Sequence, residues 1–314
     1  MRKKSEGTSH HVPVLLDQSI AGLSLKKGGC YVDGTFGRGG HSGAILDRLG
    51  PSGRLLAIDR DPQAIAEASK KLLQDPRIEL LQGEISELKK HANKRNLLGK
   101  VDGLLLDLGV SSPQLDEADR GFSFQSDGPL DMRMDPTKGE SAASWLAQVK
   151  ERDLKKVLYA FGEERNAGRI AQAIVAARSL QPILRTSQLA AIISDAAPAR
   201  GQKKHPATKT FQAIRIRIND ELRQLDDALQ ASIDLLCCGG RLCVISFHSL
   251  EDRQVKRFMR NASLESVQYR GLPEIPKEHR PLFKLVAKPV SATDDEIASN
   301  PRSRSARLRI AERL

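Results

Sequence analysis

Short apolar runs alternate with segments of helical periodicity through the first third of the chain. The runs occupy residues 31–33, 54–59, 78–82 and 101–107. The last of them is almost continuously apolar, which is typical of a central strand in a parallel sheet. Before the first run, apolar residues recur at helical spacing at 14–25. Between the second and third runs a helix is expected over 62–73, where Pro62 suits the first turn. Strands that alternate with helices predict a doubly wound α/β sheet.

The alternation breaks after the fourth run. No strand-like run occurs between Asp116 and about Pro206, and helical patterns cover residues 142–149, 153–159, 163–177 and 187–196. We therefore expect an all-helical domain inserted after the fourth strand, with sheet-domain parts at 1–115 and 207–314 and the insert at 116–206. The last part predicts one helix over 211–236, a strand at 241–247, a helix to about 259, and closing strands at 282–288 and 306–312.

Charge and cysteine content narrow the class of protein. The 314 residues carry a formal charge of +11, which favours a polyanionic partner. The four cysteines lack the spacing of metal ligands, so we expect free thiols and no metal site. No apolar run approaches the roughly 18 residues of a membrane span and the N-terminus is polar, so we expect a cytoplasmic protein without membrane contact. Monomer and homodimer remain open.

A glycine-rich loop, DGTFGRGGHS at 33–42, joins the first strand to the next helical pattern. Its glycines, among them Gly37, Gly39 and Gly40, let the backbone pass close to a ligand, so the loop predicts a cradle for a nucleotide-like cofactor. A nicotinamide dinucleotide is disfavoured because Ser42 stands where GxGxxG requires its third glycine. An acid followed by spaced glycines resembles the first motif of Rossmann-like methyltransferases. Either Asp33 or a later acid, Asp107, is placed to attract the positive sulfonium of S-adenosylmethionine.

Two further positions fit an adenosine at this edge of the sheet. Asp59 ends the second strand, where an acid is placed to accept both ribose hydroxyls. The alternative for Asp59 is a helix-capping or surface role. Ile85 follows the third strand and is placed to pack on the adenine ring, although a plain core isoleucine is an equal alternative.

The acceptor of the methyl group is expected beyond the fourth strand. Methyltransferases that act on exocyclic amino groups of bases place an Asn/Asp/Ser-Pro-Pro-aromatic turn there, whose acceptors draw on the hydrogens of a poorly nucleophilic nitrogen. Residues Ser111, Ser112 and Pro113 form a degenerate version, and an ordinary turn is the alternative. His248 follows the fifth strand and is a candidate to accept a proton or to stack on the base; alternatively it braces its loop against Glu251 or Asp252.

A basic run near the end of the insert suits RNA phosphates. It comprises Lys203, Lys204, His205, Lys209, Arg215 and Arg217. A solvated helix face is the alternative. Aromatic residues make up only 4% of the chain, which argues against an extended base-stacking platform. Recognition by shape and phosphate contact, with one base turned out into a pocket, suits this composition better.

Six segments together give a specific resemblance. They are DGTFGRGGHS at 33–42, AIDRD at 57–61, LDLGVSSPQL at 106–115, GPLDMRM at 128–134, HPATKTFQA at 205–213 and ISFHSLEDR at 245–253. In this order they resemble the MraW-type (RsmH) family of bacterial ribosomal RNA cytosine-N4 methyltransferases. The resemblance implies a Rossmann-like class I methyltransferase domain, interrupted by helices, that uses S-adenosylmethionine to methylate a cytidine in the decoding centre of 16S ribosomal RNA.

The same resemblance implies a set of cofactor residues by motif. They are Gly39, Gly40, His41, Asp59, Ile85, Asp107 and Gln114. A second function class stays open beside the enzyme, because the acceptor turn is degenerate and the charge is high. It is a catalytically weak RNA-binding protein on the same fold, acting in ribosome assembly or regulation.

Overall fold

The computed structural model describes residues 13–198, 205–265, 268–269, 274–276 and 279–314. The chain divides into two compact units. Unit 1 comprises Met1–Asp59, Ala64–Leu108 and Ala228–Leu314. Unit 2 comprises Arg60–Gln63 and Gly109–Asp227. Within the described ranges, no helix combines the length and the apolar character that crossing a membrane requires.

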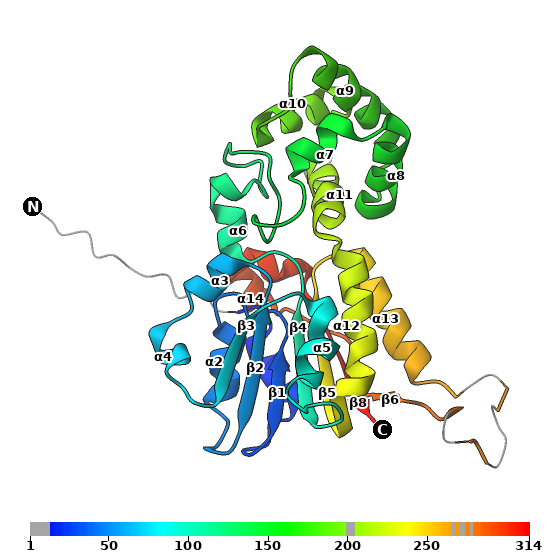
Figure 1. The fold of residues 1–314 in the computed structure, drawn as a ribbon. Helices are drawn as coiled ribbons and strands as arrows, with labels where there is room; N and C mark the ends of the chain where they lie inside the picture. The colour runs from blue at the N-terminus through cyan, green and yellow to red at the C-terminus, as the bar shows by residue number, and fades with distance from the viewer. Residues whose placement is uncertain (1–12, 199–204, 266–267, 270–273, 277–278) are drawn as a thin grey trace, which may run out of the picture. The chain divides into compact units, whose positions relative to one another are not determined.

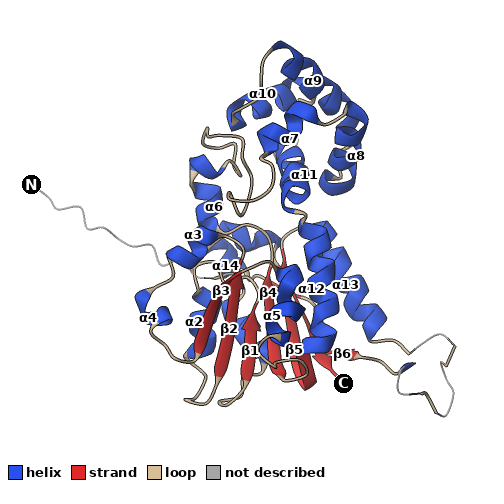
Figure 2. Ribbon diagram, viewed as in Figure 1, coloured by secondary structure: helices blue, strands red, loops and turns tan. Residues whose placement is uncertain are grey.

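Figure 2 shows the sheet on which unit 1 is built. The sheet has eight strands in the order β3-β2-β1-β4-β5-β8-β6, and β7 also pairs with β8. The strands are β1 Cys30–Asp33, β2 Arg54–Asp59, β3 Ile78–Gln82, β4 Val101–Asp107, β5 Leu236–Ser246, β6 Phe283–Leu285, β7 Val290–Ser291 and β8 Arg307–Arg313. Strands β1 to β5 pair in parallel, and β8 is antiparallel to β5, β6 and β7. The predicted α/β fold with a central parallel sheet is confirmed.

Helices cover the sheet on both faces, because its central strands are apolar on both sides. The helices that lie wholly in unit 1 are α1 Leu16–Leu23, α2 Gly40–Leu46, α4 Lys70–Leu73, α5 Leu88–Asn93, α13 Ser249–Ala262 and α14 Asp294–Ser299. Residues Leu23 and Ile45 of α1 and α2 pack with Tyr31, Leu105 and Ile310 of the sheet. Each such side chain contributes about 1.5–3 kcal/mol when fully buried. Figure 1 draws α5 in front of the strands, on the other face.

The parallel strands determine where polar side chains gather. Asp33, Asp59 and Asp107 are the last residues of β1, β2 and β4, and His248 follows β5. Because neighbouring parallel strands end at the same edge, these residues come from one edge of the sheet, where ligands of open α/β folds bind.

Unit 2 is helical and has its own apolar core. Its helices are α6 Ser112–Asp116, α7 Ala142–Gln148, α8 Glu151–Gly162, α9 Ala167–Leu180, α10 Thr186–Ala196 and α11 Ala207–Asn219. Trp145, Leu158, Ile170, Ile193 and Ile214 are among its buried side chains. Two helices, α3 Pro62–Ala66 and α12 Glu221–Leu235, have residues in both units. The short 3-10 helices are η1 Ile85–Glu87, η2 Ala118–Arg120 and η4 Pro301–Ser305. The unit includes the turn at Ser111 and helix α11, which the sequence grouped with the sheet domain.

Two predicted helices are divided in the structure. The helix expected over 211–236 is α11 and α12, separated at Asp220, whose φ of 51° is left-handed. Apolar residues continue in phase across this residue, so periodicity alone could not show the break. Strand β5 correspondingly begins at Leu236 rather than at Arg241. The helix expected over 62–73 is α3 and α4, because the Ser69 side chain caps α4 by accepting the Leu72 N–H.

Candidate active site

The glycine loop is held by the acid that precedes it. Asp33 is fully buried; its Oδ2 accepts a hydrogen bond from Ser42 Oγ at 2.7 Å, and its Oδ1 accepts one from the Thr35 N–H at 3.1 Å. Burial raises the pKa of Asp33, and the hydrogen bonds from Ser42 and Thr35 oppose that rise. Both carboxylate oxygens therefore serve to fold the loop, which makes Asp33 a positioning residue rather than a free charge for a ligand.

The loop backbone follows a path that favours glycine at two positions. Gly37 and Gly39 have φ values of +54° and +75°, in the left-handed region. The Gly37 N–H donates to Asp59 Oδ2 at 2.7 Å, which joins the loop after β1 to the end of β2. A Cβ on Gly39 would lie 2.6 Å from Leu72 Cδ1, and one on Gly40 would lie 2.2 Å from Pro13 Cγ. The hydrogen bond from the Gly37 N–H therefore holds the loop beside Asp59.

Buried His41 and half-buried Asp107 form a polar pair beside this loop. His41 is 5% exposed, and burial lowers its pKa to about 4, so its imidazole is neutral at pH 7. Its Nδ1 lies 3.6 Å from Asp107 Oδ2. Burial, followed by the charges of Asp33 and Glu251, raises the pKa of Asp107 well above its ordinary value. The Asp107 N–H donates to Thr35 Oγ1 at 2.6 Å, which ties β4 to the same loop.

The pair presents two polar atoms that the described residues do not satisfy. His41 Nε2 and Asp107 Oδ1 are buried and have no hydrogen-bond partner within the described part of the chain. Buried polar atoms in folded proteins are rarely left without partners, because each costs about 1–3 kcal/mol. Atoms of this kind are suited to a bound polar ligand.

Ile85 lies in η1, directly after β3. Its Cγ2 would be 3.5 Å from a Cβ at Gly34, so the half-buried side chain lies beside the start of the glycine loop. This position is compatible with an apolar contact to an adenine ring.

The acceptor turn is the beginning of a helix in unit 2. Ser111 is the N-cap of α6: its Oγ accepts the Gln114 N–H at 3.5 Å, and Gln114 Oε1 accepts the Ser111 N–H at 3.0 Å. Ser112 and Pro113 form the first helical positions. Gln114 Nε2 also donates to Asp61 Oδ2 at 2.8 Å. The resemblance assigns Gln114 to the cofactor, but both the oxygen and the nitrogen of its side-chain amide form hydrogen bonds within unit 2.

A buried network around Asp61 was not predicted from the sequence. Besides Gln114, Asp61 Oδ2 accepts a hydrogen bond from Arg120 Nη1 at 2.8 Å. Arg120 Nη2 donates to the carbonyl oxygens of Arg133 and Met134, at 3.2 and 2.9 Å. Asp61 and Met134 end two of the segments that carry the family resemblance, but nothing in their local patterns shows that they share a partner in Arg120. The network joins three distant segments of the chain.

His248 caps helix α13 and lies beside Glu251. Its Nδ1 accepts the Glu251 N–H at 3.4 Å, and its Nε2 lies 3.2 Å from Glu251 Oε1. Glu251 is buried, and its Oε2 accepts the Phe247 N–H at 2.8 Å. These contacts match the bracing alternative for His248, in which the imidazole fixes the loop after β5.

The side chains predicted to contact RNA differ in exposure and in the bonds they already form. Lys203 and Lys204 lie outside the described residues. His205 is exposed and its ring stacks on Phe124 at 4.6 Å between centroids. Lys209 Nζ donates to the Glu163 carbonyl oxygen at 3.0 Å.

The two arginines of the same run also differ. Arg215 makes two hydrogen bonds of 2.8 Å to the carboxylate of Glu221, and its side chain is 16% exposed. Arg217 is 44% exposed and lies over the Trp145 ring at 5.6 Å from its centroid. Arg217, whose Nη2 lies 3.8 Å from Glu140 Oε1, is the more exposed of the two, whereas Arg215 stabilises the break between α11 and α12.

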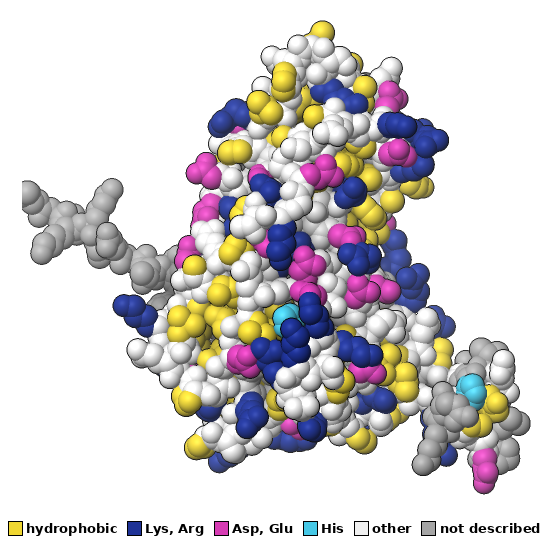
Figure 3. Space-filling view, viewed as in Figure 1, with side chains coloured by type: hydrophobic (Ala, Val, Ile, Leu, Met, Phe, Trp, Pro, Cys, Tyr) yellow, Lys and Arg dark blue, Asp and Glu magenta, His cyan; other side chains and the backbone are white. Residues whose placement is uncertain are grey.

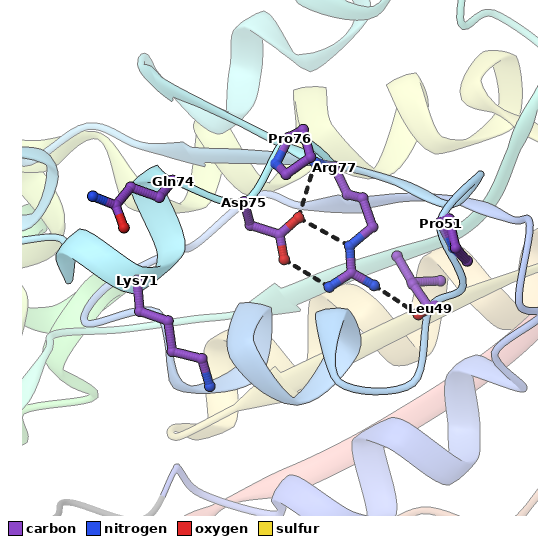
Figure 4. Close-up of a pocket in the computed structure, with 7 residues that line it drawn as sticks. All are labelled: Leu49, Pro51, Lys71, Gln74, Asp75, Pro76 and Arg77. Atoms are coloured by element: carbon purple, nitrogen blue, oxygen red, sulfur yellow. Dashed lines mark hydrogen bonds and ion pairs between the residues drawn. The ribbon is translucent and has the colours of Figure 1, made fainter.

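A hollow elsewhere in unit 1 has a different character (Figure 4). It is lined by Leu49, Pro51, Lys71, Gln74, Asp75, Pro76 and Arg77. These residues precede β2 and β3, so the hollow lies at the amino ends of the strands, away from the glycine loop. The Arg77 guanidinium donates to both carboxylate oxygens of Asp75 and to the Leu49 carbonyl oxygen. The Arg77 guanidinium is therefore engaged in hydrogen bonds within the protein, which makes this hollow a poor ligand site.

The residues at the carboxyl edge of the sheet suit S-adenosylmethionine. The glycine loop is tied to Asp59, which provides a carboxylate beside it, and His41 Nε2 and Asp107 Oδ1 are buried atoms without partners among the described residues. A charged acceptor and unsatisfied buried groups are what a cationic nucleoside with several hydroxyls would use.

Three solved structures illustrate the similarity to known proteins. Two are rRNA methylases, one from Clostridium thermocellum and one from Streptococcus thermophilus. Each is 13% identical to this chain, with a TM-score of 0.43, and each match covers 97% of this chain. The matches cover 98% of the Clostridium protein and 99% of the Streptococcus protein. A methyltransferase from Streptococcus mutans, solved in complex with SAH, is 12% identical with a TM-score of 0.42, covering 97% of this chain and 100% of its own. Similarity at this level supports no conclusion about function.

The family comparison is decisive. The model of the MraW methylase family matches residues 8–314, which is nearly the whole chain. The sheet described above, with the antiparallel β8 between β5 and β6, is of the class I methyltransferase type. The chain therefore belongs to the MraW methylase family and is a methyltransferase whose methyl donor is S-adenosylmethionine.

Proposed function

We propose that this enzyme methylates the N4 amino group of a cytidine in the decoding centre of 16S ribosomal RNA, acting on the small ribosomal subunit in the cytoplasm. The observation that carries the proposal is the family match over residues 8–314. The net charge of +11 supports a polyanionic substrate. The turn at Ser111 supports an exocyclic amino group as the acceptor.

Each residue at the sheet edge has a proposed role toward the cofactor. The Asp59 carboxylate would accept the ribose hydroxyls, and Ile85 would pack on the adenine. His41 and Asp107 would bind polar groups of the amino-acid end, through the buried atoms that lack partners. Asp33 holds the loop that carries Gly37, Gly39 and Gly40. When bound, S-adenosylmethionine supplies an electrophilic methyl group.

The residues of the acceptor turn would orient the cytosine. The lone pair of its amino nitrogen is delocalised into the ring, so catalysis requires acceptors that draw on the two hydrogens as the nitrogen attacks. We assign this role to the Ser111–Pro113 turn, whose backbone is fixed by the capping box with Gln114. Gln114 holds the turn to Asp61, two residues beyond Asp59 along the chain. Gln114 is thereby proposed as a positioning residue.

Two glycine substitutions separate backbone strain from steric clash in the loop. Gly37→Ala places its Cβ 4.0 Å from the nearest atom, so it incurs only left-handed strain of about 1–2 kcal/mol. Gly39→Ala incurs the same strain and also contacts of 2.6 to 2.9 Å with Leu72 and Phe36. We expect Gly39→Ala to weaken S-adenosylmethionine binding at least about tenfold more than Gly37→Ala. Calorimetric titration of both variants measures the difference, and equal affinities would contradict the proposed loop path.

Methyl transfer to isolated ribosomal particles tests the function. The purified protein is incubated with tritiated S-adenosylmethionine and with small subunits from a strain that lacks this enzyme. Digestion of the RNA to nucleosides is expected to yield labelled N4-methylcytidine. Label on another nucleoside would overturn the proposed acceptor. Tight RNA binding with no label, from protein that binds the cofactor, would favour the assembly or regulatory alternative.

A further inference from the structure

Helix α13 Ser249–Ala262 presents a row of positive charge to solvent. Lys256, Arg257 and Arg260 are all exposed, and their spacing of one, three and four residues places them on one helical face. Arg253 lies three residues earlier on that face and is also exposed. Figure 3 shows dark blue side chains along the margin where Figure 1 draws the orange α13. Lys256, Arg257 and Arg260 are here called the α13 stripe.

The opposite face of α13 is used for packing. Val255 and Met259 are buried, and the Phe258 ring packs edge-on against Phe283 of β6 at 6.0 Å between centroids. The helix is therefore anchored on the sheet of unit 1, and the stripe is displayed on a fixed surface rather than on a mobile tail. A rigid array loses less conformational entropy when it binds.

Acidic side chains nearby do not neutralise the stripe. The helix has two acids, and Glu251 is buried beside His248. The other, Asp252, is shared by two arginines of β8: Arg309 at 2.8 and 3.0 Å, and Arg307 at 3.5 Å. In the described part of the chain, Lys256, Arg257 and Arg260 have no ion-pair partner. This face of the helix thus keeps its positive charge.

The start of α13 links the stripe to the candidate site. The helix begins directly after His248, at the carboxyl end of β5. At 1.5 Å of rise per residue, Lys256 to Arg260 lie roughly 12–18 Å along the axis from that end. An extended polyanion whose target nucleotide reaches the sheet edge would carry its neighbouring phosphates over this distance.

We propose that the α13 stripe binds the RNA backbone that flanks the methylated nucleotide. The proposal rests on the RNA substrate proposed above. The stripe makes electrostatic contacts with phosphates that position the RNA and carry no base specificity. It lies in unit 1 and is separate from the basic run at residues 203–217.

Charge removal on the stripe tests this assignment. The triple variant Lys256→Gln, Arg257→Gln, Arg260→Gln is compared with Lys27→Gln, Arg54→Gln, Lys100→Gln. The control removes the same charge from exposed positions at the amino ends of the strands of the same unit. Binding of deproteinised 16S ribosomal RNA is measured over a series of salt concentrations. We expect the stripe variant to bind roughly 10- to 100-fold more weakly at physiological salt, with a salt slope lower by about 2–3, and the control to change little.

Three further readouts make the result decisive. Unchanged S-adenosylmethionine affinity in the stripe variant shows that its fold and cofactor site are intact, and a higher KM for small subunits at similar kcat supports a binding role. RNA affinity equal to that of the wild type would overturn the proposal. Equal RNA affinity with lost binding to small-subunit particles would also overturn it, in favour of a protein partner. If the wild type forms no N4-methylcytidine, the proposed function fails, whereas the RNA affinities still decide the role of the stripe.

Discussion

Replacement of Asp59 by alanine is expected to weaken S-adenosylmethionine binding on the order of 100-fold. The carboxylate has two functions in our proposal: it accepts the ribose hydroxyls, and its Oδ2 fixes the loop by accepting the Gly37 N–H at 2.7 Å. Hydrogen bonds to a charged group contribute about 1.5–3 kcal/mol each, and every 1.4 kcal/mol changes affinity tenfold. The loss of two such bonds accounts for the expected effect.

Calorimetric titration with S-adenosylmethionine measures the loss of affinity in Asp59→Ala. Two further variants serve as comparisons. Asp59→Asn keeps an acceptor for the Gly37 N–H but removes the charge, so we expect an intermediate affinity. Asp47→Ala removes an exposed acid at the C-cap of α2 and should bind like the wild type. An affinity of Asp59→Ala within about threefold of the wild type would refute the ribose assignment, since it would correspond to less than one hydrogen bond.

Replacement of Arg120 by alanine is expected to destabilise unit 2 by about 3–5 kcal/mol, the usual cost of removing one partner of a buried ion pair. The side chains of Arg120 and Asp61 are only 11% and 4% exposed. Without the guanidinium, the Asp61 carboxylate keeps Gln114 but loses its cation, and the carbonyl oxygens of Arg133 and Met134 lose a donor. The segment at 128–134 would lose a link to the rest of the unit.

The single tryptophan of the chain provides the measurement, because Trp145 is buried in the core of unit 2. Urea unfolding followed by its fluorescence should show a lower midpoint for Arg120→Ala. Arg120→Lys keeps the charge but lacks the planar guanidinium, so its unfolding midpoint should lie between those of Arg120→Ala and the wild type. Arg169→Ala, on the exposed face of α9, serves as the control and should stay within about 0.5 kcal/mol. Coincident curves for Arg120→Ala and the wild type would show that the network is not stabilising.

Much of the candidate site could be predicted because its signals are local. An acid, spaced glycines and a following helix lie within ten residues of each other at 33–42, and φ values of +54° and +75° at Gly37 and Gly39 are what such glycines permit. Asp59 and Asp107 could be assigned to the same edge because parallel strands share a direction. The sequence did not show that both oxygens of Asp33 are consumed by Ser42 and Thr35.

The sequence alone determined three features of this protein, because each depends on residues close together in the chain. These features are the alternation of strands and helices, the glycine loop and the segments that resemble the family. Only the tertiary structure decided that Arg120 joins Asp61 to Met134, that a left-handed Asp220 separates α11 from α12, and that Lys256, Arg257 and Arg260 of α13 have no ion-pair partner among the described residues. The physical reason is the range of the interactions. A hydrogen bond between residues 59 positions apart, or the absence of an acid opposite a lysine, depends on which segments pack together, and no local pattern of residues records it.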